Sequence, residues 1–165
     1  MNSAKPEIML IQDSRENLGY GPLFSFPYEV GTLETGDYSL QGFESLIAIE
    51  RKTLDDLVGC LTQSRKRFES ELKRSRLLHR FWVIVECSPQ EILTGNYSSQ
   101  ANPKAIWESI MAFQIRYTNF LFAYNRLMGA RMTESLLNKY AREHFKIAER
   151  ITKGYSRVTR GIADE

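Results

Sequence analysis

Residues 46–56 read Leu-Ile-Ala-Ile-Glu-Arg-Lys-Thr-Leu-Asp-Asp, an apolar run followed at once by a cluster of charges. The apolar run predicts a buried strand, and Thr53 predicts the start of a helix. Because side chains alternate along a strand, Glu50 and Lys52 are expected on one face and Arg51 on the other. Glu50 is therefore a candidate ligand of a divalent cation. Lys52 beside it would orient a water molecule and neutralise phosphate charge.

Apolar residues elsewhere in the chain predict the remaining elements. Short apolar runs predict strands at 8–11, 28–33, 81–87 and 120–124. Helical spacing predicts one long helix from 53 to 72, a second at 103–117 and a last one from about 133 past 145. Strands that alternate with helices indicate an α/β fold with a central mixed β-sheet flanked by helices. We expect a single domain over residues 1–165, with a core at about 7–145 and a basic helical tail at about 139–165.

The composition limits the classes to which the protein can belong. The 165 residues contain 22 Lys and Arg, 20 Asp and Glu, and two Cys. No apolar run approaches the about 20 residues that span a bilayer, and the N-terminal residues lack the apolar segment of a signal peptide. Cys60 and Cys87 follow no metal-binding spacing, which favours a reduced chain without disulfides. We therefore expect a cytoplasmic protein that makes no contact with a membrane.

The net charge of +2 conceals an uneven distribution along the chain. Residues 1–50 sum to −6, residues 51–80 to +5 and residues 81–165 to +3. Carboxylates hold hard cations and basic side chains attract phosphates, so the pattern is typical of a metal-dependent enzyme that acts on a polyanion. Ordinary variation of surface charge is the alternative interpretation of the same distribution.

Three further acids are candidates for the same site. Asp37, in a Gly-Asp-Tyr segment, is expected to come from a neighbouring strand as the second carboxylate that Mg²⁺ needs. Asp13 and Glu16, which follow the first predicted strand, would close the other side of the site. A second Glu-x-Lys at 71–73 falls within a predicted helix, where residues two apart do not share a face. It is therefore not expected to form such a site.

These motifs resemble those of a known family. A Gly-Asp pair at 36–37 precedes Glu-Arg-Lys-x-x-x-Asp at 50–56, and a strand ending in Asp-x-Arg-Glu at 13–16 precedes both. The pattern resembles the XPF-type structure-specific endonuclease domain, a branch of the restriction-endonuclease-like PD-(D/E)xK superfamily. The similarity covers residues 8–125 and is especially close to compact members from bacteria and phages. The resemblance implies a restriction-endonuclease-like fold.

The resemblance also implies roles for individual residues. Asp37 and Glu50 would be the central metal ligands, and Asp13 and Glu16 would complete the acidic cluster. Lys52 would be the catalytic lysine. The other implied site residues are Arg51 in the catalytic motif, Asp56 as a supporting residue, and Arg65, Lys66 and Arg67 as DNA contacts.

The implied reaction is hydrolysis of branched or otherwise structured DNA by an endonuclease that uses Mg²⁺ or Mn²⁺. The metal would polarise the scissile phosphate and lower the pKa of a bound water. Family members usually pair two nuclease domains, so we expect a homodimer. As an enzyme that acts on DNA, it is also expected to associate with the nucleoid. The C-terminal third lacks the Gly-rich hairpins of a helix-hairpin-helix module. Recognition of DNA structure would therefore need this domain, a second copy or a targeting partner protein.

Plainer interpretations stand beside several of these roles. Asp56, three residues after Thr53, matches a helix cap, and Asp55 also favours a helix N-terminus. Asp13 and Glu16 are otherwise acids of an exposed loop. The nearby Arg15 is expected to pair with a site carboxylate rather than to contact DNA. For each residue, the hydrogen-bond and ion-pair partners of its side chain will distinguish a role in the site from a structural role.

The basic tail and the chain as a whole also have alternatives. Basic residues at steps of three or four either track phosphates or form a solvated helix face. They are Lys139, Arg142, Lys146, Arg150, Lys153, Arg157 and Arg160. The rival interpretation of the whole chain is a non-catalytic DNA-binding or scaffold subunit. The complete set of acids and lysine argues against it, because inactive partners lose some of these residues. A third interpretation is that the motif serves an RNA substrate.

Overall fold

The computed structural model describes residues 7–163, and it describes side chains as far as residue 153. In chain order the elements are β1 (Leu10–Asp13), the 3-10 helix η1 (Gly21–Leu23), β2 (Tyr28–Gly31), β3 (Tyr38–Leu40), β4 (Ile47–Lys52), α1 (Leu54–Leu61), α2 (Arg65–Ser75), β5 (Arg80–Val85), α3 (Pro89–Thr94), α4 (Pro103–Arg116), β6 (Asn119–Phe122) and α5 (Arg126–Ala163). Strands and helices alternate from β4 onward, which confirms the predicted α/β class.

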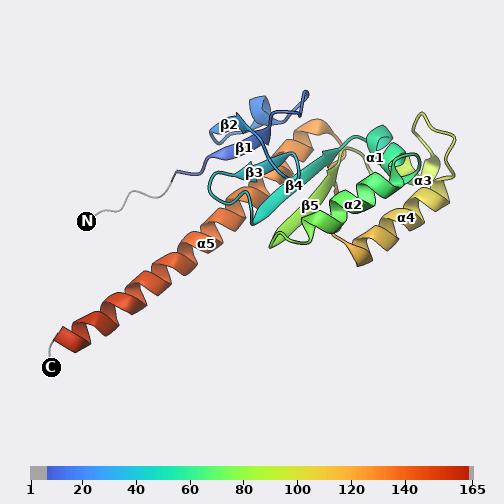
Figure 1. Ribbon diagram of the computed structural model, residues 1–165. Coiled ribbons are helices and arrows are strands. Elements are labelled where there is room, and N and C mark those ends of the chain that lie inside the picture. The colour runs from blue at the N-terminus through green and yellow to red at the C-terminus, as the bar shows by residue number, and fades with distance from the viewer. Residues whose placement is uncertain (1–6, 164–165) are drawn as a thin grey trace.

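The six strands form one sheet in the order β2-β1-β3-β4-β5-β6 (Figure 1). β1 is parallel to β2 and antiparallel to β3, and β3 is antiparallel to β4. β4, β5 and β6 run parallel to one another. The sheet is therefore mixed, as predicted, and the charged end of β4 lies between two neighbouring strands.

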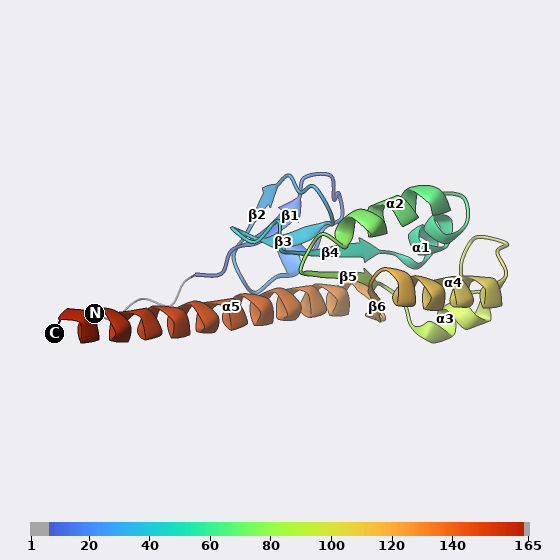
Figure 2. The same ribbon diagram turned by 60° about the horizontal axis from the view of Figure 1, so that its bottom comes forward.

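Helices cover both faces of the sheet, and each face has its own hydrophobic core. On one face, α1, α2 and α4 bury Leu57, Phe68 and Phe113 against the strands. On the other face, α5 buries Leu137 and Ala141, which are four residues apart and therefore share one side of the helix. Figure 2 shows α5 along one side of the sheet and α1 and α2 on the opposite side.

The single long helix predicted from 53 to 72 is wrong, because the structure divides this segment into α1 and α2. Thr62 leaves the helical conformation, with φ −116° and ψ −87°. The Ser64 N–H then donates to the Gly59 carbonyl at 3.0 Å, which turns the chain. Leu61 and Phe68 are seven residues apart and both buried, so the apolar period continues across the break and conceals it.

Short elements also escape the sequence pattern. β3 has three residues, too few to show alternation. α3 was not predicted although it opens with a capping box, in which Ser88 and Glu91 each accept a hydrogen bond from the other's backbone N–H. The strands predicted at 81–87 and 120–124 are confirmed in place but end earlier, at Val85 and Phe122.

α5 begins at Arg126, before the predicted start at about 133, and it continues through Ala163 without a break at Gly154. Its first part packs on the sheet and its last part projects beyond the rest of the domain (Figures 1 and 2). The side chains of Arg157 and Arg160, in the predicted basic stripe, lie outside the described residues. Within the described part of the chain, no helix is both long and apolar enough to cross a membrane.

Candidate active site

The charged end of β4 presents its side chains to two faces, as strand alternation predicts. Glu50 and Lys52 lie on one face, where the Lys52 ammonium donates to Oε1 of Glu50. Their side chains are only 6% and 15% exposed, respectively. Lys52 Nζ lies 5.6 Å from the centre of the Phe68 ring, so α2 covers one side of this pair. The predicted carboxylate–ammonium pair is therefore formed, and it is largely buried.

Asp37 reaches the same place from the start of β3. Gly36 adopts φ +82°, and a Cβ at this position would lie 2.9 Å from the Cβ of Ala48, so the turn requires glycine. The Asp37 N–H donates to the Ile49 carbonyl at 2.8 Å. Oδ2 of Asp37 accepts from the Arg51 N–H at 2.7 Å. These bonds hold the second predicted carboxylate against the end of β4.

The three charged groups perturb one another's pKa values. Burial raises the pKa of Asp37 to about 6, although the Arg51 N–H and the Lys52 charge oppose the rise. Burial also raises the pKa of Glu50 well above its usual value, and the charge of Asp37 adds to the effect. Burial disfavours the charge on Lys52, but the Glu50 and Asp37 carboxylates outweigh it and raise the pKa of the lysine. Lys52 is therefore held as a cation beside two carboxyl groups whose ionisation burial disfavours.

Two oxygen atoms of this site are left for a cation. Oε2 of Glu50 and Oδ1 of Asp37 form no hydrogen bond with any residue that the structure describes. Carboxylate oxygens are preferred ligands of Mg²⁺ and Mn²⁺, and Mg²⁺ usually takes only one or two from the protein. A divalent cation would also offset the negative charge that burial disfavours. The donor set therefore fits the implied metal, with Asp37 and Glu50 as the residues that would hold it.

The other two predicted ligands have partners of their own. Asp13 is buried, and its carboxylate accepts from the Leu33 N–H at 2.7 Å and from Arg15 Nε at 2.7 Å. This confirms the expected pairing of Arg15 with a carboxylate. Glu16 accepts from Arg51 Nη1 at 3.1 Å. Among the residues described, no three His, Cys, Asp or Glu side chains form a metal-binding group, so ligation by Asp13 and Glu16 stays a prediction.

Arg51 occupies the opposite face of β4 and makes a dense set of contacts. Its Nε and Nη2 donate to the two oxygens of Glu86 at 2.7 and 2.9 Å, and Nη1 donates to Glu16. Its guanidinium carbon lies 5.6 Å from the centre of the Tyr20 ring. Only 9% of the arginine side chain is exposed. These contacts join β4 to the end of β5 and to the loop after β1, so Arg51 supports the site from behind.

Asp56 and Asp55 behave as the plainer interpretation expects. The Thr53 hydroxyl accepts from the Asp56 N–H at 3.2 Å and donates to its Oδ2 at 2.6 Å, which caps α1. Asp55 accepts from both the N–H and the hydroxyl of Ser98, so it fastens the loop between α3 and α4. A role of Asp56 in the reaction stays a prediction.

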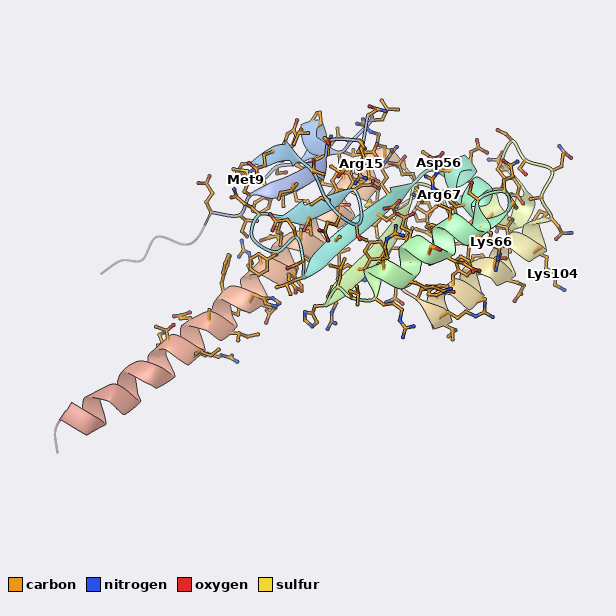
Figure 3. All side chains as sticks on the ribbon, in the orientation of Figure 1. Met9, Arg15, Asp56, Lys66, Arg67 and Lys104 are labelled. Atoms are coloured by element: carbon orange, nitrogen blue, oxygen red, sulfur yellow. The ribbon has the colours of Figure 1, made fainter. Side chains whose placement is uncertain are left out.

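The three predicted DNA contacts divide into one tethered and two free side chains. Arg65 Nη1 donates to the Ser109 hydroxyl at 3.0 Å, and the guanidinium lies 4.7 Å from the centre of the Phe113 ring. It therefore ties α2 to α4. Lys66 and Arg67 are exposed near the start of α2 (Figure 3), where contact with a phosphate is sterically open. All three DNA contacts stay predictions.

Two acids near the site were missed in the sequence. Glu86 follows β5 directly, and parallel pairing with β4 brings it to Arg51. Glu71 lies on α2 one turn after Phe68. For Glu50, its charge adds to burial and to the charge of Asp37 in raising the pKa. For Lys52, it adds to the Glu50 and Asp37 carboxylates, which raise the pKa of the lysine against the effect of burial. The i, i+3 relation to an apolar residue was the signal that could have placed Glu71 on the inner side of its helix.

Comparisons with known proteins agree with this geometry. The model of the family described as "ERCC4 domain" matches residues 12–127. XPF from Aeropyrum pernix superposes with a TM-score of 0.65 at 21% identity, over 86% of this chain and 69% of that chain. XPF from Aeropyrum pernix in complex with DNA also superposes with a TM-score of 0.65 at 21% identity, over 82% of this chain and 66% of that chain.

This chain thus spans about two thirds of the length of those XPF chains. No curated protein matches its sequence. The likeness to the solved structures establishes a common restriction-endonuclease-like fold. The segment that the family model matches contains Asp37, Glu50 and Lys52, the three groups that converge at the end of β4. The chain therefore belongs to the ERCC4-domain family, the family of XPF-type nucleases.

Proposed function

We propose that this chain is a Mg²⁺- or Mn²⁺-dependent endonuclease that hydrolyses branched or otherwise structured DNA. The observation that carries the proposal is the meeting of the buried Glu50, the half-buried Asp37 and Lys52, each carboxylate having one oxygen without a partner among the described residues. Membership of the ERCC4-domain family supports DNA as the polymer. One of the similar structures is XPF from Aeropyrum pernix in complex with DNA, which adds to that support.

The side chains divide the work of such a reaction. Asp37 and Glu50 would hold the cation, which when bound supplies a Lewis acid beside the scissile phosphate. Lys52 remains protonated, so it stabilises the negative charge that develops on the phosphate and orients water near Glu50. Arg51 acts through its backbone N–H, which fixes Asp37, and through Glu86, which fixes the end of β5.

The proposal is tested by replacing Lys52 and measuring cleavage of flap, fork, nicked, single-stranded and linear duplex DNA with Mn²⁺. Lys52→Met is expected to lower the cleavage rate by about 1,000-fold, since it removes a preorganised positive charge. Lys73→Met is the matched control, because Lys73 is the lysine of the other Glu-x-Lys and is exposed on α2. If Lys52→Met cleaves every substrate as fast as Lys73→Met, the assignment of the site is wrong.

The rival function is that of a non-catalytic DNA-binding subunit. Such a protein would bind branched DNA but would not cleave it when Mn²⁺ is added. The Lys52→Met variant would then bind the DNA as the wild type does and would also not cleave it. The presence of both acids and the lysine favours the enzyme, because an inactive partner has no need of two carboxyl groups whose ionisation burial disfavours. If the wild type cleaves any substrate in the panel and Lys52→Met does not, the chain is not a non-catalytic subunit.

The proposal includes a homodimer. Tyr124, Leu127 and Met128 are exposed apolar side chains between β6 and the first turn of α5, and they lie close together in the chain. Apolar side chains gathered in this way are typical of a surface that packs against another protein. Light scattering at micromolar concentration is expected to give twice the chain mass of 19.1 kDa. A uniform 19.1 kDa species would refute the dimer.

A further inference from the structure

A groove of about 470 Å³ lies at the opposite end of the sheet from the candidate active site. It is formed where α2 and α4 end and where β5 and β6 begin. Arg80 pairs with Ile47 in the parallel ladder, whereas Lys52 pairs with Val85 five residues further along. At about 3.3 Å per residue, the groove and the lysine are about 16 Å apart along the strands. The groove is therefore a separate place on the molecule.

The lining of the groove is basic. Arg76 comes from the end of α2 and Arg80 from the start of β5, and both are exposed. Of the described residues that line the groove, none is an Asp or a Glu. Arg80 Nη1 donates to the His79 carbonyl at 2.8 Å, which restrains its guanidinium. Arg76 forms no hydrogen bond or ion pair with a side chain that the structure describes. The described lining of the groove therefore carries an excess of positive charge.

The groove also offers aromatic surface and unused hydrogen-bond donors. Tyr117 lines it with a half-buried ring, whereas Trp82, which also lines it, packs its side chain with the core on the α5 side of the sheet. Neither the Tyr117 hydroxyl nor the Asn119 amide bonds to any residue within the described ranges. A ligand that satisfies these groups must carry several acceptor atoms and a planar surface. A nucleotide has both.

We propose that this groove binds a single-stranded segment of DNA, with a phosphate on Arg76 and Arg80 and a base against Tyr117. Guanidinium groups bind phosphate by paired hydrogen bonds, and aromatic rings stack on every base without regard to sequence. The volume is in the range of pockets that hold one small ligand. The inference deepens the proposed function, because branched DNA contains single strands that leave the cleaved duplex.

The binding test uses the full chain in EDTA, where no metal-dependent cleavage can occur. Fluorescence anisotropy with fluorescein-labelled dT12 is expected to give a dissociation constant about tenfold higher for the Arg76→Ala/Arg80→Ala double variant than for wild type. The slope of log K against log salt should fall by about 0.7 for each lost phosphate contact. Arg74→Ala is the control, since Arg74 is exposed on α2 but does not line the groove.

Photochemical cross-linking identifies the residues that contact the bound DNA. A dT12 containing one 5-iododeoxyuridine is expected to attach to Tyr117, as read by mass spectrometry of peptides. Light scattering and thermal melting should show that the variants keep the fold and oligomeric state of the wild type. The inference is overturned if Arg74→Ala weakens binding as much as the double variant, if cross-links form only elsewhere, or if free dTMP competes as well as dT12.

The two proposals fail separately. A chain that binds dT12 through the groove but cuts no DNA would uphold the groove and refute the proposed endonuclease. A chain that cuts branched DNA while the double variant binds dT12 normally would refute the groove alone.

Discussion

On one face of β4, Glu50 and Lys52 meet Asp37; on the other, Arg51 meets Glu86 and Glu16. The first face leaves one oxygen of the Glu50 carboxylate and one of the Asp37 carboxylate without a described partner. On the second face, both oxygens of Glu86 are bonded, and Nε, Nη1 and Nη2 of the arginine all donate. Consecutive residues of one motif thus belong to two faces: the face of Glu50 and Lys52, for which we propose the reaction and which is called the reactive face below, and a satisfied, structural face.

The difference shows how a charged motif can be both stable and reactive. The Arg51 network joins β4 to the end of β5 and to the loop after β1. It resembles a buried ion pair, and removing one partner of such a pair strongly lowers the free energy of unfolding. The Glu50 and Asp37 carboxyl groups have pKa values raised by burial, so the fold holds them in a state that it disfavours. Strain of this kind is expected where a cation binds. It predicts that mutation lowers the stability on the Arg51 face and raises the metal-free stability on the face of Glu50 and Asp37.

The largest effect is expected from Arg51→Met. The change leaves Glu86 and Glu16 with buried charge and no guanidinium, so the free energy of unfolding should fall by about 3–5 kcal/mol. Urea unfolding followed by tryptophan fluorescence, without metal at pH 7.5, measures it. Arg74→Met, at an exposed position of α2, should change stability by less than about 0.5 kcal/mol. Equal stability of the two variants would remove the distinction between the faces.

A smaller effect of opposite sign is expected from Asp37→Asn. The folded-state pKa of Asp37, about 6, lies above the ordinary 3.8, so the folded chain binds this proton more tightly than the unfolded chain. Ionisation therefore costs stability as the pH rises from about 4 to about 6, and the loss persists above that window. The asparagine still accepts from the Arg51 N–H, so the metal-free variant should be about 1–3 kcal/mol more stable at pH 7.5.

The measurement is the same urea unfolding repeated from pH 4 to pH 8 in EDTA. The wild type should lose stability over the lower half of this range more steeply than Asp37→Asn does. Adding Mn²⁺ should then stabilise the wild type more than the variant, because ligand binding to the folded state adds stability. A variant that is less stable than wild type at pH 7.5 without metal would contradict the picture of a strained face.

The smallest effect is expected from Glu71→Gln, which extends the reactive face to α2. Removing this charge should weaken Mn²⁺ binding by about three- to fivefold, as expected for a charge acting at a distance near the surface. Electron paramagnetic resonance of free Mn²⁺ measures the affinity. Glu69→Gln is the control, because Glu69 pairs with Arg65 at 3.3 Å. If both variants bind Mn²⁺ equally well, Glu71 has no part in the site.

Much of the candidate site could be predicted because its geometry is local. The shared face of Glu50 and Lys52 follows from the two-residue period of a strand. The Thr53–Asp56 cap follows from a three-residue spacing. The break between α1 and α2 could not be predicted in this way, because Leu61 and Phe68 keep the helical period on both sides of it.

By itself, the sequence determined the charged motif, its strand and the face that each of its side chains occupies, since these depend on neighbours within a few residues. Only the tertiary structure decided which acids face the lysine and which are tied to arginine. Glu86 reaches Arg51 through parallel strand register, and Glu71 reaches the site through the packing of α2 over β4. The groove at Arg76 and Arg80 likewise exists only where the ends of four elements meet. Contacts between distant segments depend on register and packing, which no local period of apolar residues encodes.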